Sequence, residues 1–206
     1  MTAMLPILEA LTDVVSSVRA THSGIPEVMI VLGASAPTKH GHFAANTWAL
    51  REGEGTVHEI MLSGESLKRG GLGTFGTIVH ELAHAYCNHN GIQDTSNRGR
   101  YHNREFKAVA ERFGLNIEKA DTIGFSVTSV PRETQEMYAG EIRHLDEAIN
   151  HYRVNKVVGD EVHPRAKYRM SCDCGGEPTP VSKRFLLMDM TCNFCDEPMV
   201  VTVNEP

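Results

Sequence analysis

The sequence His-Glu-Leu-Ala-His at positions 80–84 constrains this chain more than any other feature. Residues four positions apart project from the same face of an α-helix, so a helix here would present His80 and His84 to one metal ion. The flanking positions favour a buried helix: Thr77, Ile78, Val79 and Leu82. We therefore expect a metal-binding helix from about residue 74 to residue 90. The simpler alternative is a surface helix that carries unrelated histidines.

Glu81 would reach a water molecule bound to that metal. A zinc ion with three protein ligands keeps its fourth position for water and lowers the pKa of that water to about 7. Glu81 would take the proton as general base, and the oxygen would attack a carbonyl group polarised by the zinc. A purely structural zinc site has no need of a base, so the pattern predicts a catalytic site with Glu81 as the catalytic residue.

The third zinc ligand must come from further along the chain. The candidates downstream are His89, Asp94, His102 and Glu105. His89 lies about half a turn round the same helix from His84 and would point elsewhere. His102 follows a polar loop, and Glu105 lies one turn later on a second helix expected from about residue 102 to residue 113. The spacing leaves both His102 and Glu105 open.

Four of the five cysteines form two close pairs near the C-terminus: Cys172, Cys174, Cys192 and Cys195. Two tight turns that each offer two thiolates make a tetrahedral zinc site, and the spacing is typical of a zinc ribbon. The first pair is C-x-C, which is tighter than the usual C-x-x-C. We expect ribbon strands at 184–188 and 199–203, held by a structural zinc, because about 40 residues bury little core. The alternative is four unrelated reduced cysteines.

The stretch TIVHELAHAY at 77–86, followed by YHNREF at 101–106, resembles the SprT-like metallopeptidase family. This family includes the Spartan-type proteases, which degrade proteins crosslinked to DNA. Its pattern is HExxH on one helix and a third zinc-binding histidine in a His-Gly-x-x-Phe-like segment that opens the next helix. The resemblance implies that His102 is the third ligand and that Glu105 lies beside the ligands or on the helix surface. Asn103 stands where the family often has glycine.

The resemblance and the expected elements imply an α+β fold. A small antiparallel or mixed sheet would pack with the HExxH zinc-binding helix, and a C-terminal zinc ribbon would follow, as it often does in this family. We expect a metallopeptidase domain over 1–128, a connecting amphipathic helix over 129–163 and a Cys₄ zinc ribbon over 164–206. Within the connector, apolar residues at helical spacing predict one long helix from 133 to about 152.

The remaining elements follow from hydrophobic spacing. We expect a helix over 4–20, strands over 27–32, 42–50 and 57–62, and irregular or briefly extended chain over 116–131.

Two other patterns near the metal motif have simpler interpretations. Gly71, Gly73 and Gly76 spell G-x-G-x-x-G, but a dinucleotide site needs a second parallel strand after the helix, and none is expected here. We interpret these glycines as a flexible entry to the metal-binding helix. Cys87 follows His84 by three positions and could approach the metal, but we expect a small buried apolar side chain.

The formal net charge is −6, so any nucleic-acid binding must use a local basic patch. The segments 98–112 and 164–184 each hold five basic residues against two acidic ones, an excess that is common on ordinary surfaces. The resemblance implies DNA as a ligand of the ribbon. The residues concerned would be Arg165, Lys167, Arg169, Lys183 and Arg184, with Phe185 or Phe194 stacking on a base.

No apolar stretch approaches the ~18 residues of a membrane span. The N-terminal segment carries Glu9 and Asp13 within its apolar pattern and lacks the basic start of a signal peptide. We therefore expect a cytoplasmic protein with reduced thiols and no membrane partner. Nothing in the sequence indicates the oligomeric state.

The predicted function is that of a zinc-dependent metallopeptidase with a protein substrate and two zinc ions, one catalytic and one structural. The resemblance implies that the substrates are DNA-associated proteins. The alternative is a non-proteolytic, zinc-stabilised module that binds nucleic acid or protein, and the intact Glu81 favours the peptidase. Spacing does not identify the group that stabilises the oxyanion; Arg100, Tyr101 and Arg104 are near in sequence.

Overall fold

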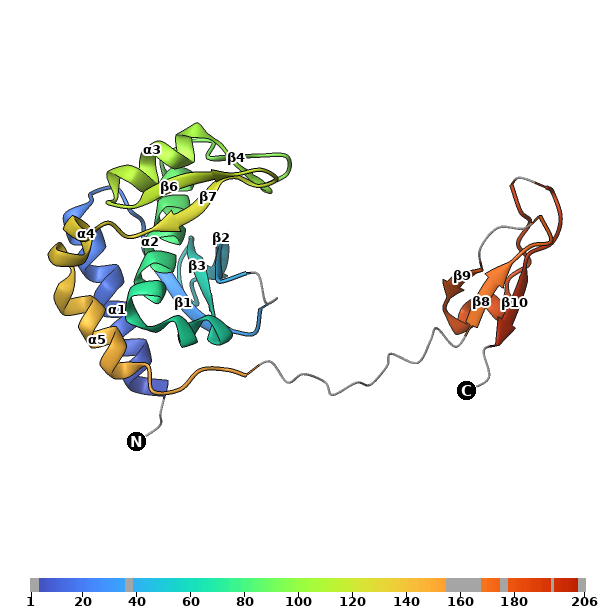
Figure 1. Cartoon of the computed structure of the whole chain (residues 1–206), viewed down its shortest axis with the longest axis horizontal. Helices are drawn as coiled ribbons and strands as arrows, with labels where there is room; N and C mark the ends of the chain where they lie inside the picture. Colours follow the sequence, from blue (N-terminus) through green and yellow to red (C-terminus); the bar gives the residue numbers. More distant parts are fainter. Residues whose placement is uncertain (1–3, 36–38, 155–167, 175–177, 194, 204–206) are drawn as a thin grey trace. The chain divides into compact units, whose positions relative to one another are not determined.

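The computed structural model describes residues 4–35, 39–154, 168–174, 178–193 and 195–203. The chain divides into two compact units, Met1–Asn155 and Lys156–Pro206 (Figure 1). Each unit is described separately below.

A central helix, α2 (Gly70–His89), organises the first unit. Its apolar side chains are fully buried at Phe75, Ile78, Val79 and Leu82. Helices α1 (Met4–Thr21) and α5 (Ala139–Ala148) pack against α2, and strands lie on its other side (Figure 1). These layers cover most of the surface of α2. The remaining stripe of the helix lines a cleft.

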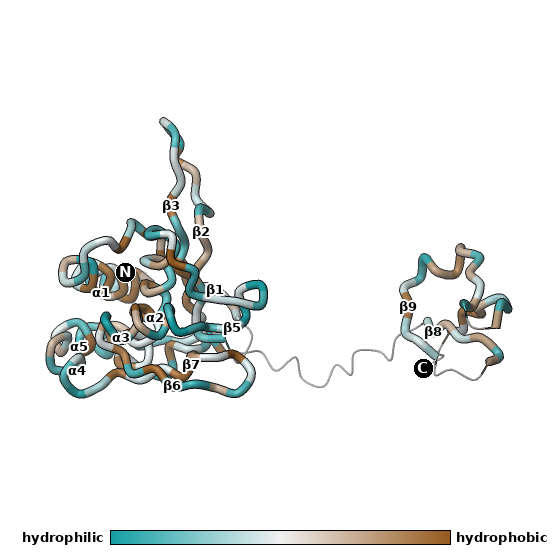
Figure 2. The backbone as a smooth tube through the Cα atoms, turned by 90° about the horizontal axis from the view of Figure 1, so that it is seen from above, coloured by the Kyte–Doolittle hydropathy of each residue, from teal (hydrophilic) through white to brown (hydrophobic). Residues whose placement is uncertain are grey.

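A mixed three-stranded sheet packs against α2. It consists of β1 (Val28–Gly33), β2 (Gly41–Ala49) and β3 (Thr56–Ser63), in the order β1-β3-β2. Strand β3 runs parallel to β1 and antiparallel to β2. Because β3 lies in the middle of this order, β2 is an edge strand of the sheet. The β2–β3 hairpin projects from the rest of the unit (Figure 2). A short 3₁₀ helix, η1 (Gly64–Arg69), then leads directly into α2.

A second sheet, in the order β4-β5-β7-β6, lies beside α2, which β7 contacts. Its strands are β4 (Thr95–Ser96), β5 (Tyr101–His102), β6 (Asn116–Ala120) and β7 (Gly124–Ser129), and α3 (Arg104–Arg112) follows β5. Residues 116–131, expected to be irregular or briefly extended, are extended over most of their length. These residues form an antiparallel hairpin that buries Ile117 in the core.

The single helix expected from 133 to 152 is two helices, α4 (Arg132–Met137) and α5, separated at Tyr138. The Tyr138 side chain is buried, and the centroid of its ring lies 5.0 Å from that of Phe75. This packing fixes the chain at the break. Gly140, a weak helix former, follows at once. Both helices belong to the first unit, and residues 155–163 of the expected connector lie outside the described residues.

The glycine-rich stretch is helical, which corrects the expectation of a flexible entry. At Gly71, a Cβ atom would lie 2.3 Å from the carbonyl oxygen of Ile142 on α5. The backbone N–H of Gly71 also donates to the Asp146 carboxylate of α5 at 2.5 Å. Glycine is therefore needed here because two helices approach closely, and not because a phosphate is bound.

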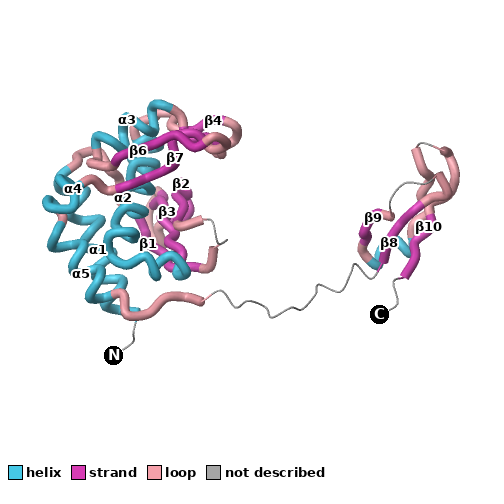
Figure 3. Tube along the Cα trace, viewed as in Figure 1, coloured by secondary structure: helices cyan, strands magenta, loops and turns pink. Residues whose placement is uncertain are grey.

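The second unit contains a small antiparallel sheet in the order β10-β8-β9 (Figure 3). Its strands are β8 (Tyr168–Ser171), β9 (Thr179–Val181) and β10 (Val200–Val203). The strand expected over 184–188 is instead the 3₁₀ helix η2 (Lys183–Leu187), whose Leu187 is 92% exposed. Of the two expected strands, only the one over 199–203 matches an observed strand.

The α+β class with small mixed and antiparallel sheets is confirmed. Within the described ranges, no helix combines the length and the apolar composition that crossing a membrane requires.

Candidate metal centres

Three histidines from two parts of the first unit meet beside α2. His80 and His84 project from α2, and His102 comes from β5; one nitrogen of each lies within 4.8 Å of the others. His102 does not open α3, as the sequence suggested. It lies in a short strand paired with Gly124 of β7, while the Asn103 side chain caps α3 by accepting from two backbone N–H groups.

Each of these histidines makes a hydrogen bond through Nδ1. The partners are Thr128 Oγ1 for His80 at 2.8 Å, the Asp94 carboxylate for His84 at 2.5 Å and the Ile123 carbonyl for His102 at 3.2 Å. An ionised carboxylate and a carbonyl can only accept, so Nδ1 carries the proton in His84 and in His102. In the neutral rings, both Nε2 atoms then hold lone pairs.

The Nε2 atoms of His84 and His102 lie 3.1 Å apart. Two lone pairs that face each other at this distance repel unless a cation lies between them. Two imidazoles bound to one zinc at about 2.0–2.1 Å in tetrahedral geometry would place their nitrogens roughly 3.3 Å apart. The three histidines therefore fit a metal ion, and the fit is compatible with zinc.

The ligand rings are held by packing as well as by hydrogen bonds. The fully buried Phe106 of α3 lies against all three imidazoles, with ring centroids 4.4 Å apart at His84 and 4.7 Å apart at His80 and His102. Burial, followed by the two other histidines, lowers the pKa of His80 well below its usual range. Burial also lowers the pKa of His102. The neutral form, which binds metals, is thereby favoured.

Glu81 is a buried carboxyl group next to the first ligand, with 6% of its surface exposed. Burial raises its pKa to about 7, although the charges of His84 and Lys39 and a hydrogen bond from the Phe43 backbone oppose the rise. The Phe43 bond attaches Glu81 to edge strand β2. A carboxylate with a pKa near 7 can accept and return a proton at neutral pH.

The histidines and Glu81 open into a cleft of about 1320 Å³. Residues 39–43, at the start of β2, form one wall, and residues 126–130 of β7 and the following turn form another. Small-molecule pockets usually measure about 300–1,000 Å³, so this cleft can accommodate a larger ligand.

The other residues considered near this site lie apart from it. Glu105 is an exposed residue in the first turn of α3 and does not belong to the histidine cluster. Cys87 is fully buried in the hydrophobic core, where burial is the first cause that raises its pKa to about 12. Asp94, one of the candidate ligands, instead binds the far nitrogen of His84.

Sequence reasoning missed Thr128 and Ile123, the partners of His80 and His102. Both lie in the segment expected to be irregular or briefly extended, and GFSVTS at 124–129 alternates polar and apolar side chains as strands do. That alternation could have revealed β7, although not its placement beside α2.

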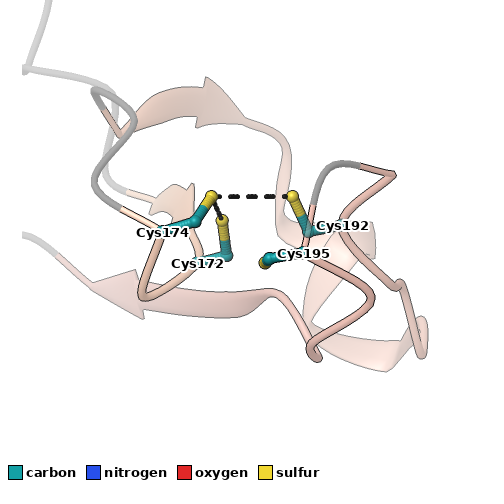
Figure 4. Close-up of side chains that lie close together, drawn as sticks. All are labelled: Cys172, Cys174, Cys192 and Cys195. Atoms are coloured by element: carbon teal, nitrogen blue, oxygen red, sulfur yellow. Dashed lines mark hydrogen bonds between the residues drawn. The ribbon is translucent and has the colours of Figure 1, made fainter.

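The four C-terminal cysteines also converge, with their sulfur atoms within 4.8 Å of one another (Figure 4). The Sγ atoms of Cys174 and Cys192 lie 3.8 Å apart, and those of Cys172 and Cys174 lie 2.7 Å apart. No disulfide links the chain's five cysteines, all of which are described. Four thiolates around zinc, at about 2.3 Å each, would lie roughly 3.8 Å apart. The Cys174–Cys192 distance matches this value and the Cys172–Cys174 distance is shorter; the four cysteines could hold a metal ion.

Local turns present these thiols. Cys172 follows β8 directly, and Cys192 lies in a turn closed by hydrogen bonds from Cys192 N–H to the Glu197 carbonyl and from Asp196 N–H to the Cys192 carbonyl, both 2.9 Å. The neighbouring thiols, Cys172 first, raise the pKa of Cys174 to about 12. Four thiolates cannot coexist at neutral pH unless a cation offsets their charge.

No protein-family model, curated protein or solved structure matches this chain.

Proposed function

We propose that this protein is a zinc metallopeptidase of the SprT-like type that hydrolyses peptide bonds in proteins. One observation carries the proposal: the buried carboxyl group of Glu81 lies beside three converging histidines in an open cleft. A structural metal site would gain nothing from a buried carboxyl at this position, because the burial of an ionisable group costs stability.

Each residue of the site would have a distinct role in the reaction. His80, His84 and His102 would hold a zinc ion, which when bound polarises a carbonyl group and lowers the pKa of a coordinated water to about 7. Glu81 would accept the proton of the attacking water at its carboxylate and pass it to the leaving amine. Asp94 and Thr128 would keep two of the imidazoles in the required orientation.

The cleft supports a polypeptide substrate rather than a small molecule. Its walls include edge strand β2 and strand β7, and its volume of about 1320 Å³ exceeds that of usual small-molecule pockets. An unfolded protein such as casein, free of tertiary structure, is therefore the appropriate first substrate.

The experiment is a metal-depletion cycle on the full-length protein. A chelator should stop the cleavage of casein, and stoichiometric zinc should restore it, whereas magnesium should not. Cleavage that persists in the metal-depleted protein would contradict the proposal.

A role for DNA is a proposal that rests on the second unit. Among the described residues, Arg169, Lys183 and Arg184 supply basic charge to the second unit, whereas Arg165, Lys167 and Phe194 lie outside the described residues. Binding through phosphates would weaken steeply with salt, and K183Q/R184Q should reduce the log–log salt slope by about 1.8. The control K68Q should leave it unchanged. Fluorescence anisotropy with single- and double-stranded DNA measures the salt slopes of both variants. An unchanged slope in K183Q/R184Q would exclude Lys183 and Arg184 as phosphate contacts.

A further inference from the structure

A single arginine marks one end of the cleft. Arg69 immediately precedes α2 and lines the same cleft as the three histidines. Its side chain runs along the helix, and Nη2 donates to the Gly73 carbonyl at 2.8 Å and to the Thr77 hydroxyl. The guanidinium group is therefore fixed on the stripe of α2 that faces the cleft.

The helix is shaped to accept this side chain. A Cβ atom at Gly73 would lie 2.7 Å from Cβ of Arg69 and 3.5 Å from its Cζ and Nε. Only glycine leaves space at this position for Arg69 to lie against the helix. The glycine stretch thus serves two purposes, since Gly71 admits α5 and Gly73 admits Arg69.

The guanidinium group has no counter-ion within the described part of the chain. No described carboxylate lies within 4.0 Å of it, and no described acceptor binds Nε or Nη1. The side chain is exposed at the surface of the cleft, where desolvation lowers the pKa of Arg69. An accessible, anchored cation with unused donors is arranged to bind an anion.

Lys39 adds a second positive charge to the lining of the cleft. His40 also lines the cleft, near Arg69, and its neutral form is favoured. The charges of Arg69 and Lys68 reach His40, where burial and then these two cations lower the pKa. Thr77 precedes His80 by three residues of α2, so the anchored guanidinium lies on the order of one helical turn along the axis from His80, the nearer of the two ligand histidines on this helix. One or two residues of an extended chain, at about 3.3 Å each, span that distance.

We propose that Arg69 is a specificity-determining residue that binds a carboxylate of the polypeptide substrate one or two residues from the cleaved bond. This inference rests on the proposed peptidase function. The carboxylate belongs either to an Asp or Glu side chain or to a free C-terminus, since both present the same two oxygens to a guanidinium group.

The test is cleavage of a complex peptide mixture by the zinc-loaded full-length protein, read by mass spectrometry. Peptides are supplied with free and with amidated C-termini. Enrichment of Asp or Glu near the cleaved bond identifies the side chain as the source, and dependence on the free C-terminus identifies the terminal carboxylate. The best peptide is then compared with its Gln or amide analogue in the wild type and in R69Q, R69K and K68Q.

We expect R69Q to reduce the preference for the carboxylate at least ~10-fold, mainly through KM, because a hydrogen bond between charged groups is about twice as strong as one between neutral groups. R69K should keep part of the preference. K68Q makes the same charge change at an exposed neighbour outside the cleft lining and should keep all of it. A second readout needs no catalysis: E81Q should bind the best peptide at least 10-fold more tightly than E81Q/R69Q.

The outcomes separate the two claims. Cleavage that E81Q abolishes but that is indifferent to substrate carboxylates, or a preference that R69Q retains, overturns the role of Arg69 alone. If the wild type cleaves none of the peptides, the proposed function fails and this inference fails with it. Thermal unfolding of R69Q and R69K shows whether either variant has lost the fold, and R69K with an intact fold and no carboxylate preference at all also contradicts the role of the positive charge.

Discussion

The carboxylate of Asp94 accepts a hydrogen bond from Nδ1 of His84 at 2.5 Å, and thereby turns Nε2 of His84 toward His102. Asp94 lies ten residues beyond His84, in the loop after α2, so the loop contributes to the metal site although it supplies no ligand. Groups that orient metal-binding histidines in this way usually affect metal affinity strongly.

Replacing this carboxylate should weaken metal binding. D94N cannot supply the negative charge, and we expect the zinc affinity of the histidine site to fall about 10- to 100-fold. Competition with a chromophoric chelator measures the change. The control is D13N, which removes the carboxylate of another Asp–His pair, Asp13 and His144, on the surface. Equal zinc affinities of D94N and the wild type would exclude this role.

The two clusters should bind two zinc ions per chain. H102A should lose about one of them and C192S the other, because each cluster would lack a ligand. E105A should lose neither, since Glu105 lies outside both clusters. Elemental analysis of the purified variants gives the counts. A wild-type count near one, or loss of zinc from E105A, would disagree with this assignment.

The contact between α2 and α5 gives a stability prediction from two glycines. In G71A the new methyl group would meet the Ile142 carbonyl, so we expect a loss of about 1–3 kcal/mol in the free energy of unfolding. A Cβ atom at Gly140, on α5, would have no described atom within 4 Å, and G140A should stabilise by up to about 1 kcal/mol. Denaturant titration compares the two. Equal effects of the two substitutions on the free energy of unfolding would mean that the close approach of α2 and α5 does not require glycine at position 71.

Burial of Glu81 gives a pH prediction for the zinc-free protein. Its pKa is about 7 in the folded state against 4.5 unfolded, so folding favours the protonated form. The resulting penalty is absent below pH 4.5, grows as the pH rises to 7 and then stays constant. The stability of E81Q relative to the wild type should therefore increase over this range by up to about 3 kcal/mol.

Denaturant titrations of the zinc-free proteins between pH 4.5 and 8 measure this difference. E105Q, a change at an exposed glutamate, is the control and should show no such trend. A constant difference between E81Q and the wild type across the range would rule out a raised pKa for Glu81.

Much of the fold could be predicted from local patterns. The spacing of apolar residues predicted α1, α2 and the strands β1, β2 and β3 within a few residues. The failures occurred where distant contacts decide. Whether Gly71 begins a helix depends on α5, and whether residues 133–152 form one helix or two depends on the packing of Tyr138 against Phe75. Neither contact can be predicted from the residues that are neighbours in sequence.

The residues of the histidine site also include some that local spacing predicted and one that depends on distant contacts. His80, Glu81 and His84 share one helical turn, so their spacing alone predicted their neighbourhood. His102 could not be distinguished from Glu105 by spacing, because the decision depends on β5 pairing with β7 at Gly124. At that glycine, a Cβ atom would lie 2.2 Å from the His102 carbonyl, a constraint that only the assembled sheet reveals.

The central claim is that Glu81 is the general base of a zinc peptidase, and the most direct measurement is the rate of casein cleavage by E81Q. Glutamine keeps the shape of the side chain but cannot accept the proton. The account predicts that E81Q retains two zinc ions and the fold while cleavage falls at least ~10²-fold, the usual effect of losing a general base. Cleavage by zinc-loaded E81Q at the wild-type rate would contradict it.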